Sequence, residues 1–273
     1  MLRWFKAVDR ILRGEATRLS TIREGTIRIP TPGVTLVIVV LGMIYGFFMG
    51  WFALLNRAEP EYWQLFASTV KVPALFFLTL VVTFPSLYVF NALVGSRLAL
   101  GSVFRLIIAA FAVTLAVLAS FGPITAFFSI STENYSFMVL LNVLLFAVAG
   151  LLGLGFLLQT LHRLSIVGTE APPPPPAGNA DAGNAAGEGG HGHEKPDVRD
   201  PEGALDQIEG QVLGPHVRSV FRCWVVIFAL VGAQMSWVLR PFIGDPAQPF
   251  EWFRQRQSNF FEALWHTIVS LFT

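Results

Sequence analysis

VRSVFRCWVVIFALVGAQMSWVLRPFIGDPAQPFEWFRQRQSNFFEAL, residues 217–264, carries most of the unusual chemistry of this chain. Its apolar run carries Gln234 and ends at Arg240 and Pro241, and a tight turn of glycine, aspartate and proline follows at 244–246. A long apolar run is typical of a helix that crosses a membrane. The aromatic segment after the turn is typical of a helix that lies on the membrane surface. The stretch therefore predicts an integral membrane protein.

The composition of the whole chain agrees with this prediction. Of 273 residues, 53% are hydrophobic and 14% are charged, whereas soluble domains carry about 25% charged residues. The formal net charge is +1, so no bulk basicity points to nucleic acid as a partner. The single cysteine, Cys223, excludes an internal disulfide and a cysteine-based metal cage. The first apolar run is too long and too far into the chain for a cleavable signal peptide.

Five apolar runs are long enough to cross the roughly 30 Å hydrocarbon core of a bilayer. They cover about 34–55, 70–94, 106–128, 137–161 and 220–239. Gly122 and Pro123 are expected to interrupt the third run, and the fifth extends to Ile243 if a kink at Pro241 is tolerated. The predicted fold class is an all-α polytopic membrane bundle of five transmembrane helices, flanked by amphipathic interfacial helices at both termini.

The terminal segments carry the two predicted interfacial helices. Residues 1–29 combine apolar residues at helical spacing with arginines and a lysine, which favours a basic helix lying on anionic lipid. The alternative is an ordinary solvated or partner-packed helix. At the other end, residues 259–272 place aromatic and aliphatic side chains on one face but are too few to cross a bilayer. Asn259 is expected to cap this helix, with Glu262 three residues on.

Between the fourth and fifth runs, residues 166–216 form a predicted disordered linker. Five consecutive prolines precede a stretch rich in Gly, Ala and Asn, and such a composition supplies no apolar residues for a core. His191 and His193 are too weak a signal for a metal site, so neither a metal nor a cofactor is expected. The domain divisions are thus 1–29, 30–165, 166–216, 217–244 and 245–273.

The charges predict an orientation. With five spans, 14 of the 19 Lys and Arg residues fall on the side of the N-terminus and the linker, and five fall on the opposite side. Positive residues concentrate on the cytoplasmic side of membrane proteins. The N-terminus and linker are therefore predicted to be cytoplasmic, and the C-terminus is predicted to lie on the outer face of a plasma (inner) membrane.

Small residues predict where helices approach closely. Gly42, Gly46 and Gly50 recur every fourth residue and form a smooth stripe, and Gly150 and Gly153 suggest a second packing face. The first stripe is expected to pack against another span of the same chain, in preference to a second copy.

Polar residues in or beside the spans are the candidate site residues. Asn142 is expected to hydrogen-bond to a neighbouring helix, and Lys71 to snorkel towards the interface. Pro85 marks either a structural kink or part of a transport pathway. Arg240 has three interpretations: snorkelling, a salt bridge, or the binding of an anionic ligand or lipid headgroup. The candidate partners for the salt bridge are Glu133, Asp245 and Glu61.

Two longer runs carry a resemblance to a known family. KVPALFFLTLVVTFPSLYVFNALVGSRL from Lys71 and ALVGAQMSWVLRPFIGDP from Ala229, with NFFEA near the end, resemble an uncharacterised family of bacterial five-span membrane proteins. The span pattern is also loosely similar to that of Yip1-type membrane proteins. The resemblance implies a five-span fold and no activity.

No motif in the chain predicts catalysis. HExxH, GxSxG, Walker and CxxC patterns are absent from the sequence, and every Asp and Glu falls outside the predicted spans. We therefore expect a non-enzymatic membrane scaffold or accessory subunit, with membrane lipids and other membrane subunits or further copies of itself as partners. The alternative is a small-solute or ion transporter, and an enzyme or lipid-handling protein is a third, weaker hypothesis. The polar path of a transporter would use Pro85, Asn91, Asn142, Gln234 and Arg240.

Overall fold

The computed structural model describes residues 2–14, 31–56, 61–93, 100–169, 215–240, 242–255 and 258–272. Within these ranges the chain is all-helical, and its seven helices are α1 Leu2–Leu12, α3 Thr31–Leu55, α4 Tyr62–Leu93, α5 Leu100–Ser131, α6 Tyr135–Thr169, α7 Pro215–Leu239 and α8 Phe260–Phe272. Five of them, α3 to α7, are long and apolar enough to cross a membrane. The predicted fold class, a polytopic helical membrane bundle, is thereby confirmed.

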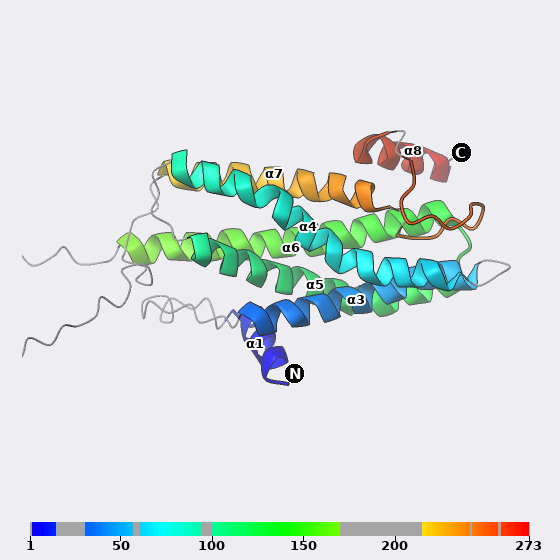
Figure 1. The fold of residues 1–273 in the computed structure, drawn as a ribbon, viewed down its shortest axis with the longest axis horizontal. Helices are drawn as coiled ribbons and strands as arrows, with labels where there is room; N and C mark the ends of the chain where they lie inside the picture. Colours follow the sequence, from blue (N-terminus) through cyan, green and yellow to red (C-terminus); the bar gives the residue numbers. More distant parts are fainter. Residues whose placement is uncertain are drawn as a thin grey trace, which may run out of the picture.

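The five long helices run alongside one another (Figure 1). Helix α3 packs against α4 and α5, and α5 packs against α6. Helix α4 crosses the bundle from α3 to α7, and α7 has α4 as its main neighbour (Figure 1). Helix α1 lies beside the N-terminal end of α3, whereas α8 lies over the opposite end of the bundle. The two terminal helices are therefore placed at different ends of the spans.

The spans differ greatly in how far the chain itself covers them. In α5, 67% of the apolar segment is buried by the other helices, and in α7 only 17% is. Helix α5 is thus the centre of the bundle, whereas α7 is peripheral. The exposed side chains of α7 include Val226 and Leu230, which fits a helix whose outer surface faces hydrocarbon.

Two predictions about the ends of the spans are wrong, and one is confirmed. Helix α4 begins at Tyr62, eight residues before the predicted start. Helix α5 continues through Gly122 and Pro123 without interruption, because a membrane helix tolerates proline when neighbouring groups satisfy the freed backbone. Gly122 also provides the space that the Phe48 ring of α3 occupies. Helix α7 ends at Leu239, as predicted.

Some predicted segments fall outside the described residues. Helix α6 extends to Thr169 and α7 begins at Pro215, so the described helices enter the predicted linker from both sides. The remainder of that linker, 170–214, lies outside the described residues, and so do His191 and His193 within it. The described part of the predicted N-terminal helix is the eleven-residue α1.

Candidate functional site

A polar face on α4 is the most unusual feature of the described spans. Gln64, Ser68 and Lys71 stand at positions i, i+4 and i+7, which places all three on one side of the helix. Their exposed fractions are 1%, 0% and 3%. Polar side chains buried at membrane depth need partners, because an unpaired polar group in hydrocarbon is costly. We name these three residues the α4 polar face.

The partner of this face is residues 242–255, which follow α7 and which we name the return loop. The Nε2 atom of Gln64 donates to the Phe242 carbonyl oxygen at 2.9 Å, and the Ser68 hydroxyl donates to the same oxygen. A Cβ placed on Gly244 would lie 2.8 Å from the Ala53 Cβ and 2.9 Å from the Gln64 Cγ. Only glycine lets the loop approach this closely to α3 and α4.

Lys71 anchors the loop a second time. Its ammonium donates to the Trp252 carbonyl oxygen and lies 5.9 Å from the Trp252 ring centroid and 5.0 Å from that of Phe253. A carbonyl dipole and aromatic faces both favour a cation. Instead of snorkelling to solvent, as the sequence analysis expected, Lys71 is covered by the return loop. The loop supplies the polar surroundings that a buried charge requires.

Charged side chains within the return loop, and Arg240 just before it, also hold the loop in place. Arg254 forms an ion pair with Asp245, at 3.9 Å, and its Nη2 atom donates to the Pro249 carbonyl oxygen at 3.4 Å. Arg240 donates from Nη2 to the Gln255 carbonyl oxygen at 2.7 Å, and its guanidinium carbon lies 3.8 Å from the Trp237 ring centroid. Arg240 therefore helps to close the loop on the end of α7. Its predicted salt bridge and its predicted anionic ligand stay predictions.

Gln234 lies at the contact between α7 and α8. Its Oε1 atom accepts from the Phe260 backbone N–H at 3.4 Å, while the Trp237 indole N–H donates to the Ser258 carbonyl oxygen at 2.6 Å. Asn259 Oδ1 accepts from the Glu262 backbone N–H at 2.9 Å, so Asn259 caps α8 as the sequence predicts. These bonds fix where α8 begins relative to α7.

Asn142 belongs to a separate polar contact between α6 and α3. The Tyr45 hydroxyl donates to Asn142 Oδ1 at 2.7 Å, and Asn142 Nδ2 donates to the Met138 carbonyl oxygen at 2.8 Å. Tyr45 and Asn142 are 0% and 2% exposed. The predicted interhelical bond of Asn142 is thus present, and its partner is the phenol of Tyr45.

Near Pro85, the polar groups of α4 bind α7. The Trp224 indole N–H lies 3.2 Å from the Ser86 hydroxyl oxygen and 3.4 Å from the Thr83 carbonyl oxygen, and both can accept from it. A proline removes one hydrogen bond from the helix around it. Next to Pro85, the Trp224 indole supplies a hydrogen bond from α7 to this part of α4. The side chain of Asn91 lies outside the described residues.

The glycine stripe of α3 lies against α4. A Cβ on Gly46 would be 2.5 Å from the Ser68 carbonyl oxygen, and one on Gly50 would be 2.9 Å from the Leu65 Cα. Gly42 meets Pro73 in the same way, with a placed Cβ 3.2 Å from the Pro73 Cα. In α6, Gly153 abuts Thr114 of α5, whereas a Cβ on Gly150 would have nothing within 4 Å.

Together these contacts define the class of protein: a multi-pass helical membrane protein in which a return loop is bound to the end of the bundle. In the part of the chain that the structure describes, no three His, Cys, Asp or Glu side chains gather as metal ligands. Comparison of the chain with protein-family models, with curated proteins and with solved structures finds no match.

The sequence analysis did not identify Gln64, Ser68 or Trp252 as site residues. The 4+3 spacing of Gln64, Ser68 and Lys71 is visible in the sequence, and it marks a single helical face. That spacing was hidden because α4 was predicted to begin after Ser68. The carbonyl oxygens that the face binds lie more than 170 residues away in the chain, and no local pattern points to them.

Proposed function

We propose that this protein is a non-enzymatic multi-pass scaffold or accessory subunit of a membrane complex. The observation that carries the proposal is that those described polar side chains of the spans that hydrogen-bond to another element do so at separate places in the bundle. Asn142 binds Tyr45, Gln234 binds the start of α8, and the α4 polar face binds the return loop. A transport path needs polar groups that face one shared route. Here each of these polar groups hydrogen-bonds to a neighbouring element of the same chain, which supports a structural role.

The uncovered sides of the bundle fit the same proposal. Only 28% of the apolar segment of α6 and 17% of that of α7 are buried within the chain. Leu144, Leu151 and Leu152 of α6 are more than half exposed. Surfaces of this kind contact lipid tails or the helices of other subunits. A rigid bundle with two open lateral faces is suited to holding partner subunits.

The resemblance to bacterial five-span membrane proteins supports the five-span fold on which the proposal rests and assigns no activity. It also supports placement in a bacterial inner membrane, and the charge bias supports a cytoplasmic N-terminus. On this proposal the segment between α6 and α7 is on the cytoplasmic side and tethers or recruits partners there.

Purification from native membranes in a mild detergent tests the proposal. The mass and protein composition of the intact particle are measured, and we expect a defined complex that contains other membrane proteins in fixed ratio. A lone monomer, or a homo-oligomer without other proteins, would contradict the subunit role. A tagged unrelated five-span protein, purified from the same cells, controls for proteins that adhere to any detergent-solubilised bundle.

One observation favours the alternative, a small-solute or ion transporter. Lys71 is a cation buried within a spanning helix, and intramembrane charges are frequent in ion and solute pathways. Flux from liposomes loaded with sodium, potassium or chloride separates the two functions. If the protein is a scaffold, ion flux from liposomes that contain it should equal the passive leak from liposomes without protein. Flux that is present in the natural chain and lost in Asn142→Leu or Gln234→Leu would favour transport.

A further inference from the structure

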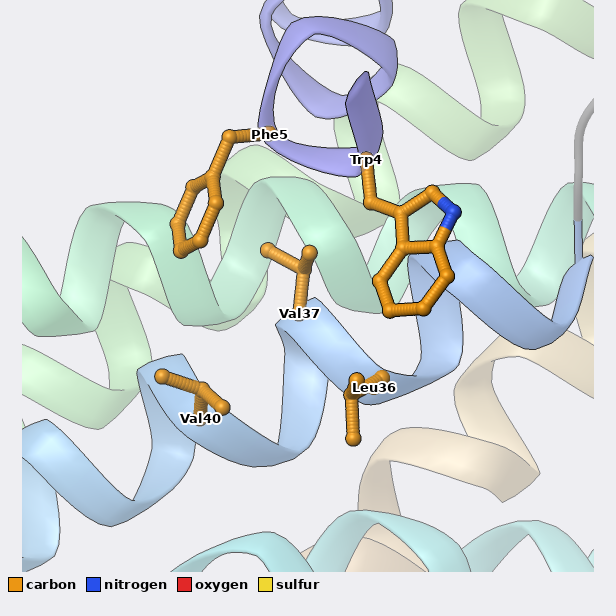
Figure 2. Close-up of a pocket in the computed structure, with 5 residues that line it drawn as sticks. All are labelled: Trp4, Phe5, Leu36, Val37 and Val40. Carbon is orange, nitrogen blue, oxygen red and sulfur yellow. The ribbon is translucent and has the colours of Figure 1, made fainter. Parts of the chain in front are cut away.

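An apolar hollow lies between α1 and α3. It is lined by Trp4 and Phe5 of α1 and by Leu36, Val37 and Val40 of α3. Figure 2 shows Trp4 and Phe5 reaching from α1 towards α3, with Val37 between them. Trp4, Phe5 and Leu36 are 37%, 42% and 39% exposed, so the hollow opens sideways from the bundle and is not a sealed cavity.

Packing holds this hollow in shape. Val8 and Ile11, about one and two turns further along α1, are 3% and 2% exposed and belong to the core of the bundle. The Trp4 ring lies on Gly33, where a Cβ would come 2.5 Å from the Trp4 Cδ1 atom. Helix α1 therefore packs against the spans through apolar side chains. The absence of a side chain at Gly33 leaves room for the Trp4 indole on the first turn of α3.

The other side of α1 is basic. Lys6 and Arg10 are exposed and stand one turn apart, so their side chains are neighbours on the helix surface. At about 100° per residue they lie roughly 100° and 140° around α1 from Phe5. Arg13 forms an ion pair with Asp9 at 3.0 Å, which balances the one carboxylate of α1. The hollow and a pair of cations thus flank the same short helix.

We propose that the hollow and these two cations form a binding site for an anionic phospholipid. A segment of one acyl chain lies along α3 against Phe5, Leu36 and Val40, and the phosphate of the headgroup contacts Lys6 and Arg10. An eleven-residue helix is about 16 Å long, too short to span, and it is seated at the end of a spanning helix, where headgroups lie. An apolar groove and a cation pair at that level match the two chemical parts of a lipid.

The test uses the full-length chain in detergent, stripped of lipid and then incubated with phosphatidylglycerol or phosphatidylcholine of identical acyl chains. Native mass spectrometry measures the lipid that stays bound. We expect phosphatidylglycerol to be retained in preference. Each basic residue near a phosphate contributes about fivefold in affinity, so Arg10→Gln should lower retention about fivefold and the Lys6→Gln/Arg10→Gln double variant about 25-fold. Arg222→Gln removes an exposed cation from α7, on the other side of the bundle (Figure 1), and should leave retention unchanged.

The apolar half of the site is tested with Val40→Trp, which fills the hollow. Retention of phosphatidylglycerol should fall, while the helical circular dichroism and the unfolding temperature should stay those of the natural chain. Equal retention of the two lipids, or a double variant that binds as the natural chain does, would overturn the proposal. The proposal would also be overturned if the natural chain were a dimer and Val40→Trp made it monomeric, because the hollow would then hold a second copy of the chain in place of a lipid. None of these outcomes depends on the scaffold role.

Discussion

The Phe242 carbonyl oxygen is held by two side chains of the α4 polar face. Gln64 donates to it from Nε2, and the Ser68 hydroxyl is within reach of both this oxygen and the Gln64 carbonyl oxygen, 2.9 Å away. A carbonyl oxygen has two lone pairs and a hydroxyl has one hydrogen, so the Phe242 oxygen can accept from both side chains when the Ser68 hydrogen points to it. Because both donors act on one acceptor, their contributions to stability should be coupled.

Removing both donors should therefore cost more than the sum of the single changes. We expect Gln64→Leu and Ser68→Ala to lower the free energy of unfolding by about 1 kcal/mol each, since one donor remains. The double variant leaves the buried carbonyl without either donor and should cost about 3 kcal/mol or more. Unfolding in detergent measures the cost, and limited proteolysis should show new cleavage in the return loop. Ser131→Ala, at an exposed serine on α5, is the control, and an additive double variant would contradict the shared-acceptor geometry.

What the sequence predicts at this scale is the chemistry of a residue and not its partner. Asn142 in an apolar run had to find a hydrogen bond to another helix, because hydrocarbon offers none. Nothing in the sequence singles out Tyr45, 97 residues earlier, as the donor. For Lys71 the sequence suggested snorkelling, since a lysine near a span end commonly reaches water. The return loop covers Lys71 instead, and this contact joins residues about 180 positions apart, which a local sequence pattern does not predict.

At the scale of helices, the α3–α4 contact depends on backbone-to-backbone approach. Gly46 faces the Ser68 carbonyl oxygen and the Thr69 Cα, with a placed Cβ 2.5 and 2.8 Å away. These are main-chain atoms, which cannot move aside by changing a rotamer. The helices would have to separate to admit a methyl group, which would also disturb Ser68 and the loop bound to it.

Gly46→Ala and Gly150→Ala form a matched pair that tests this contact. We expect Gly46→Ala to lower the free energy of unfolding by about 2–3 kcal/mol through overpacking. Gly150→Ala adds the same methyl group where nothing lies within 4 Å, so it should be neutral or slightly stabilising, because alanine is the better helix former. Unfolding temperatures in one detergent compare the two. Equal effects would show that Gly46 is not at a close helix contact.

The helices themselves were largely predictable, and their ends were not. Length and hydropathy identify five spans because every membrane-spanning segment of this class must satisfy its own backbone. The Gly122–Pro123 pair was expected to break α5, as it would in water. In the bundle, Phe48 packs on Gly122 and the helix continues. The start of α4 was missed because Gln64 and Ser68 are polar in sequence and buried in the fold.

At the scale of the whole molecule, five spans predict that the two termini lie on opposite sides of the membrane. The described structure has α1 beside one end of the spans and α8 over the other (Figure 1). We expect a reporter fused at the N-terminus, or inserted within 170–214, to be on the cytoplasmic side. A reporter fused after residue 273 should be on the outer side. An impermeant label applied to intact cells measures this, and labelling of both termini from the same side would contradict the five-span topology.

We expect buried polar pairs to hold the elements of this bundle together, and the Tyr45–Asn142 pair offers a test of this claim between two spans. A double-mutant cycle with Tyr45→Phe, Asn142→Leu and the double variant measures their coupling from unfolding in detergent. The 2.7 Å bond between α3 and α6 predicts a coupling of about 0.5–1.5 kcal/mol, the range of hydrogen bonds between membrane helices. A coupling near zero would mean that Asn142 does not fasten α6 to α3 and would contradict the claim.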